Sequence, residues 1–255
     1  MYAEERQQAI ATLVGQRGRV SVTDLSEQYG VTTETVRRDL AALDRMGLIR
    51  RVHGGAVPAA ALTAIELGTG EREHSHAAEK DRIAKAALEF LPPTGGSVLF
   101  DAGTTTARVA ALLPTDRELV AVTNSVPIAA RLSGHAAVRL HLLGGRVRGV
   151  TQAAVGPETQ RMLSELRVDV AFIGTNALAS GHGLSTPDID EAAVKRVMVA
   201  SAHRVVVVAD SSKVGREDLV RFAAIEDIDA LVTDTDLVPS VRNELTEYGI
   251  EVVTA

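Results

Sequence analysis

The feature that most constrains the fold is an alternation of short apolar runs with helix-like segments, which begins at Ala77 and continues to the C-terminus. The apolar runs are rich in β-branched residues, as buried strands are. They cover residues 98–100, 119–122, 138–143, 170–173, 205–209, 230–232 and 250–253. The four valines 205–208 form a continuous apolar run, which is typical of a strand covered on both faces. The sequence therefore predicts an α/β fold with an open, mostly parallel sheet and helices on both sides.

Composition and charge limit the class of protein. With 255 residues, 45% hydrophobic and 24% charged, the chain is predicted to be globular, with one or two domains. It has no uninterrupted apolar run of about 18 residues, and its N-terminus is acidic where a signal peptide is basic. It also contains no cysteine, which excludes disulfides and thiolate chemistry. We therefore expect a cytoplasmic protein with no membrane partner.

The first 57 residues predict a small helical domain. Helical patterns cover residues 2–16, 22–29 and 33–46, and Gly30 supplies the tight turn between the second and third. In the third helix, Val36, Leu40 and Leu43 form the buried stripe, and Thr32 is the expected N-cap. Its outward residues are Thr33, Thr35, Arg37 and Arg38. Arginine can pair with guanine and threonine can contact phosphate, so this set suits a DNA-recognition helix.

Positive charge is concentrated next to this helix although the net charge of the chain is -6. Residues 37–57 contain five arginines against Asp39 and Asp44, and residues 48–57 alternate apolar with basic residues before a turn at Gly54-Gly55. That pattern predicts a β-wing, and local charge is what meets a phosphate backbone. The alternative for the helix alone is a solvated face with an ordinary ion pair between Glu34 and Arg38.

The segment between the two patterned regions is rich in alanine and glycine and lacks sustained periodicity. We predict a winged helix-turn-helix domain at 1–57, a linker at 58–75 and a ligand-binding domain at 76–255. His74 and His76 form an HxH pair in this segment. Without cysteines or suitably spaced carboxylates we expect no metal there, and the chain predicts no cofactor.

A second functional signal lies at 98–113, with the sequence VLFDAGTTTARVAALL. An apolar strand leads through Asp101 and Gly103 into three threonines at a helix N-terminus, where amides and the helix dipole favour an anion. The alternative is that the threonines only cap the helix. Because ligands on open α/β sheets bind at the carboxyl ends of strands, the polar residues that follow the other strands predict a shared pocket. The residues expected to bind an anionic, polyhydroxylated ligand are Lys80, Asp101, Gly103, Thr104, Thr105, Thr106, Asn124, Ser125, Gly144, Gly145, Thr175, Asn176, Asp210 and Lys213.

The N-terminal run VSVTDLSEQYGVTTETVRRDLAALDRMGLIRRVHGGAV resembles the winged helix-turn-helix of DeoR-type bacterial transcriptional regulators. The resemblance continues in EKDRIAKAAL, DAGTTT, VTNS, LGG, IGTNAL, GLSTPDIDEAAVKR and ADSSK, which are similar to the sensor domain of that family. It implies sequence-specific DNA binding, with Thr35, Arg37 and Arg38 nearest the bases. Arg50, Arg51 and His53 are then expected near the DNA backbone or minor groove.

The resemblance also implies a fold for the C-terminal domain, that of ribose-5-phosphate isomerase and related sugar-phosphate enzymes. The implied function is that of a regulator, most often a repressor of a sugar-metabolism operon, whose DNA affinity changes when a phosphorylated sugar binds. A homo-oligomer, dimer or tetramer, is expected, since a dimer presents two recognition helices roughly 34 Å apart.

Two alternative functions stay open on the sequence. One is a sugar-phosphate isomerase-like enzyme with an accessory DNA-binding domain. Those enzymes have an acidic pair where this chain has Gly174-Thr175-Asn176, and an asparagine amide cannot act as a general base. The acids Asp188, Asp190 and Glu191 are interpreted chiefly as N-terminal charges of the next helix. The other alternative is an oligomerisation module with an empty pocket.

Overall fold

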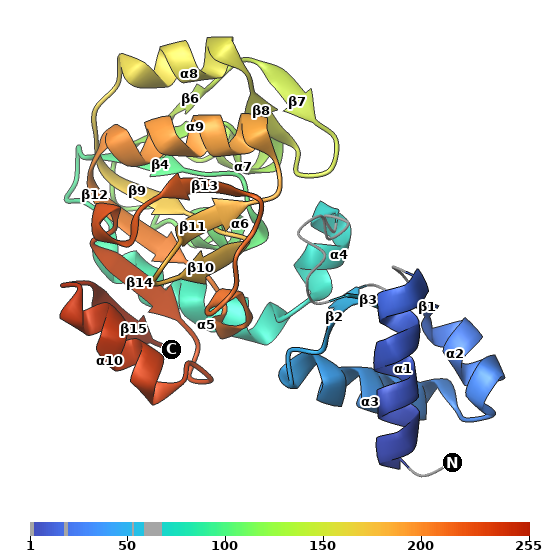
Figure 1. Cartoon of the computed structure of the whole chain (residues 1–255). Helices are drawn as coiled ribbons and strands as arrows, with labels where there is room; N and C mark the ends of the chain where they lie inside the picture. The colour runs from blue at the N-terminus through green and yellow to red at the C-terminus, as the bar shows by residue number, and fades with distance from the viewer. Residues whose placement is uncertain (1–2, 18–19, 53, 59–67) are drawn as a thin grey trace. The chain divides into compact units, whose positions relative to one another are not determined.

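The computed structural model describes residues 3–17, 20–52, 54–58 and 68–255 (Figure 1). The chain divides into two compact units, Met1–Leu67 and Gly68–Ala255. Among the described helices, none combines the length and the apolar character that crossing a membrane requires.

The first unit has the predicted helices and wing. Its elements are α1 (Ala3–Arg17), β1 (Val20–Ser21), α2 (Val22–Tyr29), α3 (Thr33–Arg45), β2 (Ile49–Val52) and β3 (Gly55–Pro58). The predicted stripe of α3, Val36, Leu40 and Leu43, is at most 1% exposed and packs in one core with Ile10 of α1 and Leu25 of α2. The apolar side chains at helical spacing therefore fix three short helices around one small core.

A two-residue strand that the sequence did not predict completes the wing. β1 pairs antiparallel with β3, which pairs antiparallel with β2, so the sheet order is β1-β3-β2. Gly55 makes this possible, because a Cβ atom at that position would lie 1.9 Å from the carbonyl oxygen of Val20. Gly54 turns the hairpin with φ of 72°, in the left-handed region that favours glycine.

The second unit is built on a seven-stranded sheet of order β15-β14-β12-β9-β4-β5-β6. Every neighbouring pair in it is parallel. The strands are β4 (Ser97–Phe100), β5 (Leu119–Thr123), β6 (Val138–Leu142), β9 (Val168–Ile173), β12 (Ala202–Val208), β14 (Ala230–Thr233) and β15 (Glu251–Thr254). Each coincides with one of the seven predicted apolar runs, so the α/β prediction is confirmed.

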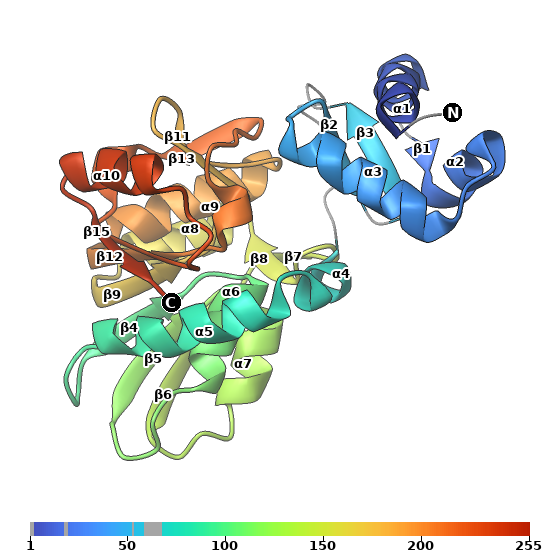
Figure 2. The ribbon, with the colours of Figure 1, turned by 90° about the horizontal axis from the view of Figure 1, so that it is seen from below.

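Helices cover both faces of this sheet (Figure 2). One face packs against α5 (Ala77–Ala87), α6 (Thr104–Ala111) and α7 (Val126–Leu132), and the other against α8 (Pro157–Ser164), α9 (Ile189–Ala200) and α10 (Pro239–Glu247). Successive residues of the valine run alternate between the two cores: Val205 and Val207 pack in one, Val206 and Val208 in the other. Burial on both faces explains why the valine run of that strand has no polar residue, whereas His203 and Arg204 before it are exposed.

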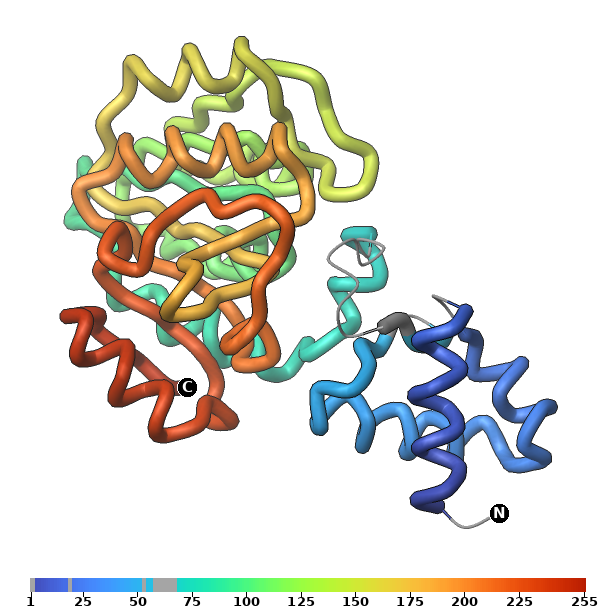
Figure 3. The backbone as a smooth tube through the Cα atoms, in the orientation of Figure 1, coloured from blue at the N-terminus to red at the C-terminus, as the bar shows by residue number. Residues whose placement is uncertain are grey.

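Short antiparallel additions, which lack a long apolar run, were not predicted. β7 (Arg146–Arg148) and β8 (Ala153–Val155) form a hairpin, and β10 (Ala177–Ala179), β11 (Gly183–Thr186) and β13 (Val220–Ala223) form a second small sheet. The path of the chain through the hairpin can be followed in Figure 3. Three single-turn helices complete the unit: η1 (Leu88–Phe90), η2 (Ser211–Lys213) and η3 (Ile225–Asp227).

The segment expected to be a linker, 58–75, differs at both ends from that expectation. Pro58 belongs to β3, and helix α4 (Thr69–His74) belongs to the second unit. The helix was missed because none of its six residues is buried, so it has no apolar pattern to detect. The ring nitrogen Nδ1 of His74 lies 2.8 Å from the carbonyl oxygen of Gly70, one turn earlier.

Candidate functional site

The strand order places the predicted ligand residues at one edge of the sheet. From β4 the chain adds β5 and β6 on one side, and then returns to add β9, β12, β14 and β15 on the other. The order therefore reverses between β4 and β9, and ligands of open α/β sheets bind outside the carboxyl ends at such a point. The ends of β12, β9, β4 and β5 are consecutive neighbours there and carry Asp210, Gly174, Asp101 and Asn124.

A buried ion pair occupies the switch point itself. The carboxylate oxygen Oδ2 of Asp101 accepts hydrogen bonds from Lys195 Nζ and, at 2.9 Å, from the backbone N–H of Gly174. Lys195 also donates to the carbonyl oxygen of Gly174 at 2.9 Å, and both side chains are at most 5% exposed. Burial raises the pKa of the Asp101 carboxyl, while the Lys195 ammonium acts in the opposite direction. The pair ties α9 to the ends of β4 and β9.

The side chain of Asn124 fixes the turn after β4 by hydrogen bonds. Asn124 accepts from the N–H of Ala102 at 3.1 Å and donates to the carbonyl of Ala154 at 3.0 Å. The chain then enters α6, whose first residues, Thr104, Thr105 and Thr106, are all buried. The Thr106 hydroxyl donates to Gly103 O at 2.9 Å, and no side chain caps the helix. First-turn amides of a helix have no intrahelical acceptor, so this end can receive an anion.

A second group of charges lies at the end of β12, where Asp210 is close to Lys80 of α5. Asp210 is buried and accepts a hydrogen bond from the Ser212 hydroxyl. Burial raises the pKa of Asp210, but the Lys213 charge, the Ser212 hydrogen bond and the His76 and Lys80 charges together outweigh burial, so the net pKa is lowered. Desolvation lowers the pKa of the buried Lys80 to about 8, and the Asp210 carboxylate opposes that shift. Helices on opposite faces of the sheet thus each bring one buried lysine to the carboxyl edge, α5 with Lys80 and α9 with Lys195.

Other predicted ligand residues have identifiable structural partners. Ser125 accepts from the N–H of Ile128 at 3.4 Å as the N-cap of α7. Thr175 donates to Ala177 O at 2.7 Å. Gly144 and Gly145 follow the edge strand β6, which β5 separates from β4.

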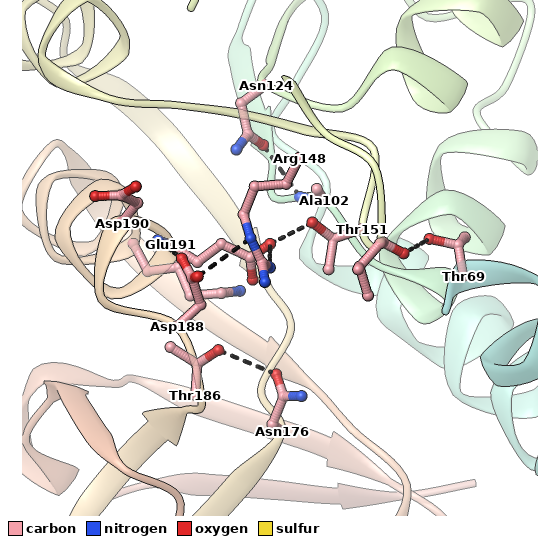
Figure 4. Close-up of polar contacts among 12 residues, drawn as sticks. Thr69, Ala102, Asn124, Arg148, Thr151, Asn176, Thr186, Asp188, Asp190 and Glu191 are labelled. Atoms are coloured by element: carbon pink, nitrogen blue, oxygen red, sulfur yellow. Dashed lines mark hydrogen bonds and ion pairs between the residues drawn. The ribbon is translucent and has the colours of Figure 1, made fainter. Parts of the chain in front are cut away.

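Asn176 lies at the rim of this edge of the sheet and is partly buried. Its Oδ1 accepts from the Thr186 hydroxyl at 3.4 Å (Figure 4). The amide therefore presents polar atoms without a titratable proton.

Sequence reasoning missed a polar cluster that joins the β7–β8 hairpin to the start of α9 (Figure 4). Arg148 of β7 donates to Glu191 Oε1 at 2.6 Å and its Nε lies 3.2 Å from Asp188 Oδ2. The Thr151 hydroxyl also donates to Glu191. Asp188 is the N-cap of α9, accepting from the N–H of Glu191 at 2.9 Å, which confirms the helix-start interpretation of these acids. Their second role depends on a hairpin 40 residues away, which no local pattern reveals.

The first unit presents the expected arginines on the outer face of α3. The side chains of Arg37 and Arg38 are 59% and 80% exposed, and they lie 3.8 and 3.6 Å from Glu34. Thr33 is exposed, whereas the Thr35 hydroxyl lies 2.9 Å from that of the cap residue Thr32.

A buried ion pair sits beneath this outer face. Arg6 of α1 donates to Asp39 at 2.6 Å, and Gln7 donates to the same carboxylate at 2.9 Å. The carboxylate hydrogen bond raises the pKa of Arg6, although burial opposes the shift. Asp39 is thus neutralised inside the unit, so it does not offset the outward arginines.

The wing carries the remaining predicted DNA contacts. Arg50 and Arg51 lie on β2, where Arg51 pairs with Ala56 of β3. The backbone N–H of Arg51 donates to Asp44 Oδ1 at 3.1 Å, which joins the wing to the end of α3. The side chain of Arg51 is exposed and that of Arg50 is partly buried. His53 lies outside the described residues.

This combination of an exposed basic helix with a wing, followed by a parallel sheet with a polar carboxyl edge, has counterparts among known proteins. Residues 6–60 match the family described as the DeoR-like helix-turn-helix domain, and residues 75–235 match the DeoR C terminal sensor domain. The chain belongs to the DeoR family of transcriptional regulators. The predicted resemblance is therefore confirmed over nearly the whole chain.

Individual relatives align from end to end. The HTH-type transcriptional regulator GlpR of Haloferax volcanii is 42% identical over 253 residues, which cover 99% of this chain and 98% of the relative. The glycerol-3-phosphate regulon repressor of Escherichia coli K12 is 33% identical over 251 residues, 98% of each chain. A structure of ribose 5-phosphate isomerase A from Methanocaldococcus jannaschii matches 55% of each chain at 18% identity, with a TM-score of 0.41.

Proposed function

We propose that this regulator is a repressor of a carbohydrate-related operon and that a phosphorylated sugar bound at the carboxyl edge of its sheet changes its affinity for DNA. One observation carries the proposal: Lys80, Asp210, the threonines of α6 and Asn124 come from neighbouring strand ends and helix starts around the switch point. Lysine and helix amides suit a phosphate, whereas Asn and Asp side chains suit sugar hydroxyls. Relatives named for the glycerol-3-phosphate regulon and for a lactose phosphotransferase system support the same ligand class.

The DNA contacts that we propose are on α3 and the wing. Arg37 and Arg38 are exposed and only loosely paired with Glu34, so they can exchange that partner for guanine edges or phosphates at little cost. Arg50, Arg51 and His53 are proposed to contact the backbone or the minor groove. Because the proposed operator is chromosomal DNA, we propose that the protein acts in the cytoplasm.

A second copy of the chain is part of the proposal. Helix-turn-helix proteins place two recognition helices in half-sites roughly 34 Å apart or a multiple of that, so a small rotation between subunits spoils the fit. The effector must therefore bind two arrangements of the protein with different affinity. Light scattering with and without an operator duplex tests whether a dimer or tetramer forms.

The experiment that tests the ligand class is a thermal-shift screen at fixed salt. Glycerol 3-phosphate, fructose 1-phosphate and other hexose phosphates are compared with the same sugars without phosphate. We expect a concentration-dependent rise in melting temperature for at least one phosphorylated sugar, and none for its unphosphorylated form. Operator binding by gel shift is then measured with that ligand. Absence of stabilisation by any phosphorylated sugar contradicts the proposed effector class.

We propose no catalytic activity for the sensor unit. The carboxylate at the switch point, Asp101, is committed to Lys195 and Gly174. The resemblance to sugar-phosphate isomerases implies an acidic pair where this chain has Gly174-Thr175-Asn176, and an asparagine amide cannot act as a general base. Turnover assays on pentose and hexose phosphates test this. Isomerisation that disappears in Asp101→Ala would establish an enzyme instead.

A further inference from the structure

Helix α4 is the first element of the sensor unit, and it is fixed there by polar contacts at both of its ends. None of its residues is buried, so apolar packing contributes little to its position. At its start, the N–H and hydroxyl of Thr69 both donate to Val150 O of the β7–β8 hairpin, at 2.9 Å each. At its end, Lys80 Nζ donates to Arg72 O at 2.6 Å and to Ser75 O at 2.7 Å.

Arg108 of α6 provides the other contact at the end of α4. Its Nη2 donates to the carbonyl of Glu73 at 2.9 Å and lies 2.9 Å from the Glu73 carboxylate. The same guanidinium donates to Thr104 O at 3.1 Å and to Asp81 at 2.8 Å. The end of α4 is therefore held by one cation from α5 and one from the helix that begins with the three threonines.

Both hydrogen bonds of the buried Lys80 go to neutral carbonyls. The Asp210 carboxylate nearby favours the ammonium, whereas the Lys213, Arg72 and Arg108 charges disfavour it. An ionised acceptor attracts the ammonium by its full charge in addition to the hydrogen bond, which a neutral carbonyl does not. An anion that reaches Lys80 thus competes effectively with the two carbonyls of α4.

We propose that α4 is the element that reports the ligand: an anionic group at the carboxyl edge takes Lys80 from the carbonyls of Arg72 and Ser75 and releases the end of α4. This inference rests on the proposed function. Residues 59–67 join α4 directly to the helix-turn-helix unit in the chain. The position of α4 therefore sets where that connection enters the sensor unit. Because the ligand binds the released form more tightly, it shifts the population toward that form, and anything that favours the docked form weakens the ligand.

Spin labels test the proposal on the full chain, which has no cysteine of its own. One label pair joins Glu71→Cys on α4 to Ser164→Cys on α8, and a control pair joins Glu89→Cys to Ser164→Cys. These three positions are exposed. Without ligand, we expect Lys80→Met to broaden the distance distribution of the α4 pair and to raise the ratio of released to docked form roughly tenfold or more, since two hydrogen bonds from a charged donor are lost. The control pair stays unchanged. Arg108→Met, which removes a partly exposed side chain, is expected to broaden the distance distribution of the α4 pair less than Lys80→Met does.

In a second experiment, glycerol 3-phosphate, fructose 1-phosphate and inorganic phosphate are added to the spin-labelled proteins that retain Lys80. Any probe that raises the melting temperature is expected to broaden the α4 pair and not the control pair. Stabilisation without broadening overturns the role of α4 and leaves the proposed function standing. Stabilisation by no probe overturns the proposed function and the ligand's part in the release of α4. Unchanged distances in both Lys80→Met and Arg108→Met overturn the claim that these cations hold the helix.

Discussion

The outer face of α3 and the carboxyl edge of the sensor sheet both carry conspicuous cations, but in opposite surroundings. Arg37 and Arg38 are more than half exposed, and their distances to Glu34 exceed 3.5 Å. Lys80 and Lys195 are each 4% exposed and make short hydrogen bonds inside their own unit. An exposed cation costs little to hold free, whereas a buried cation must be paired. Substitution on α3 should therefore change DNA binding alone, and substitution at the carboxyl edge should change stability as well.

The largest effect is expected at the switch point. Lys195→Met leaves Asp101 buried without its cation, and breaking a buried ion pair costs about 3–5 kcal/mol of the free energy of unfolding. Urea unfolding followed by circular dichroism measures the loss. The matched control is Arg196→Met, one residue along α9, whose exposed guanidinium donates to Arg221 O at 2.6 Å. Equal losses in the two variants would remove the distinction between buried and exposed cations.

The next effect is on DNA. Arg37→Ala should weaken binding to the specific operator by about 1–3 kcal/mol, or roughly tenfold to a hundredfold, because a paired contact to a base is lost. The melting temperature and the affinity for the sugar phosphate should stay as in the wild type. Gel shifts at fixed salt provide the measurement, and Arg17→Ala on α1, also exposed, is the charge-matched control. An unchanged gel shift for Arg37→Ala contradicts its assignment.

A smaller effect is expected from pH at Lys80. Its pKa is lowered to about 8 from 10.5, so the folded protein releases this proton before the unfolded chain does. Stability therefore carries a penalty below about pH 8 that disappears as pH rises toward 10.5. Relative to Lys80→Met, the wild-type urea midpoint should rise over that interval, while the affinity for an anionic sugar falls. A constant difference between the two midpoints would rule out this titration.

The smallest effect is expected for Glu34→Gln. Its ion pairs to Arg37 and Arg38 are long and exposed, so stability should change by less than about 0.5 kcal/mol. Removing the acid leaves both arginines without competition, so affinity for non-specific DNA should rise slightly. Thermal unfolding and fluorescence anisotropy with a random duplex measure the two quantities. A large loss of stability would show that these arginines are held more firmly than their exposure indicates.

The elements that follow from local pattern were predictable. The seven strands of the main sheet, the buried stripe of α3 and the turn at Gly30 all come from side chains near one another in sequence. The ends of the strands could also be located, and Asp101, Asn124 and Asp210 do follow strands of one parallel sheet at its carboxyl edge. Helix α4 and strand β7 could not be predicted, because neither contains a buried residue, and the buried strand β8 is only three residues long.

The sequence by itself determined the two-part organisation into a basic helical unit and an α/β unit, together with the family and the polar strand ends. Only the tertiary structure decided which polar groups already have hydrogen-bond partners elsewhere in the chain. Lys195 meets Asp101 across 94 positions, Glu191 meets Thr151 across 40, and Thr69 meets Val150 across 81. Such pairings depend on which strand ends become neighbours and on which face each helix covers. The packing of the whole sheet determines the strand neighbours and the helix faces, so a short stretch of sequence cannot reveal these pairings.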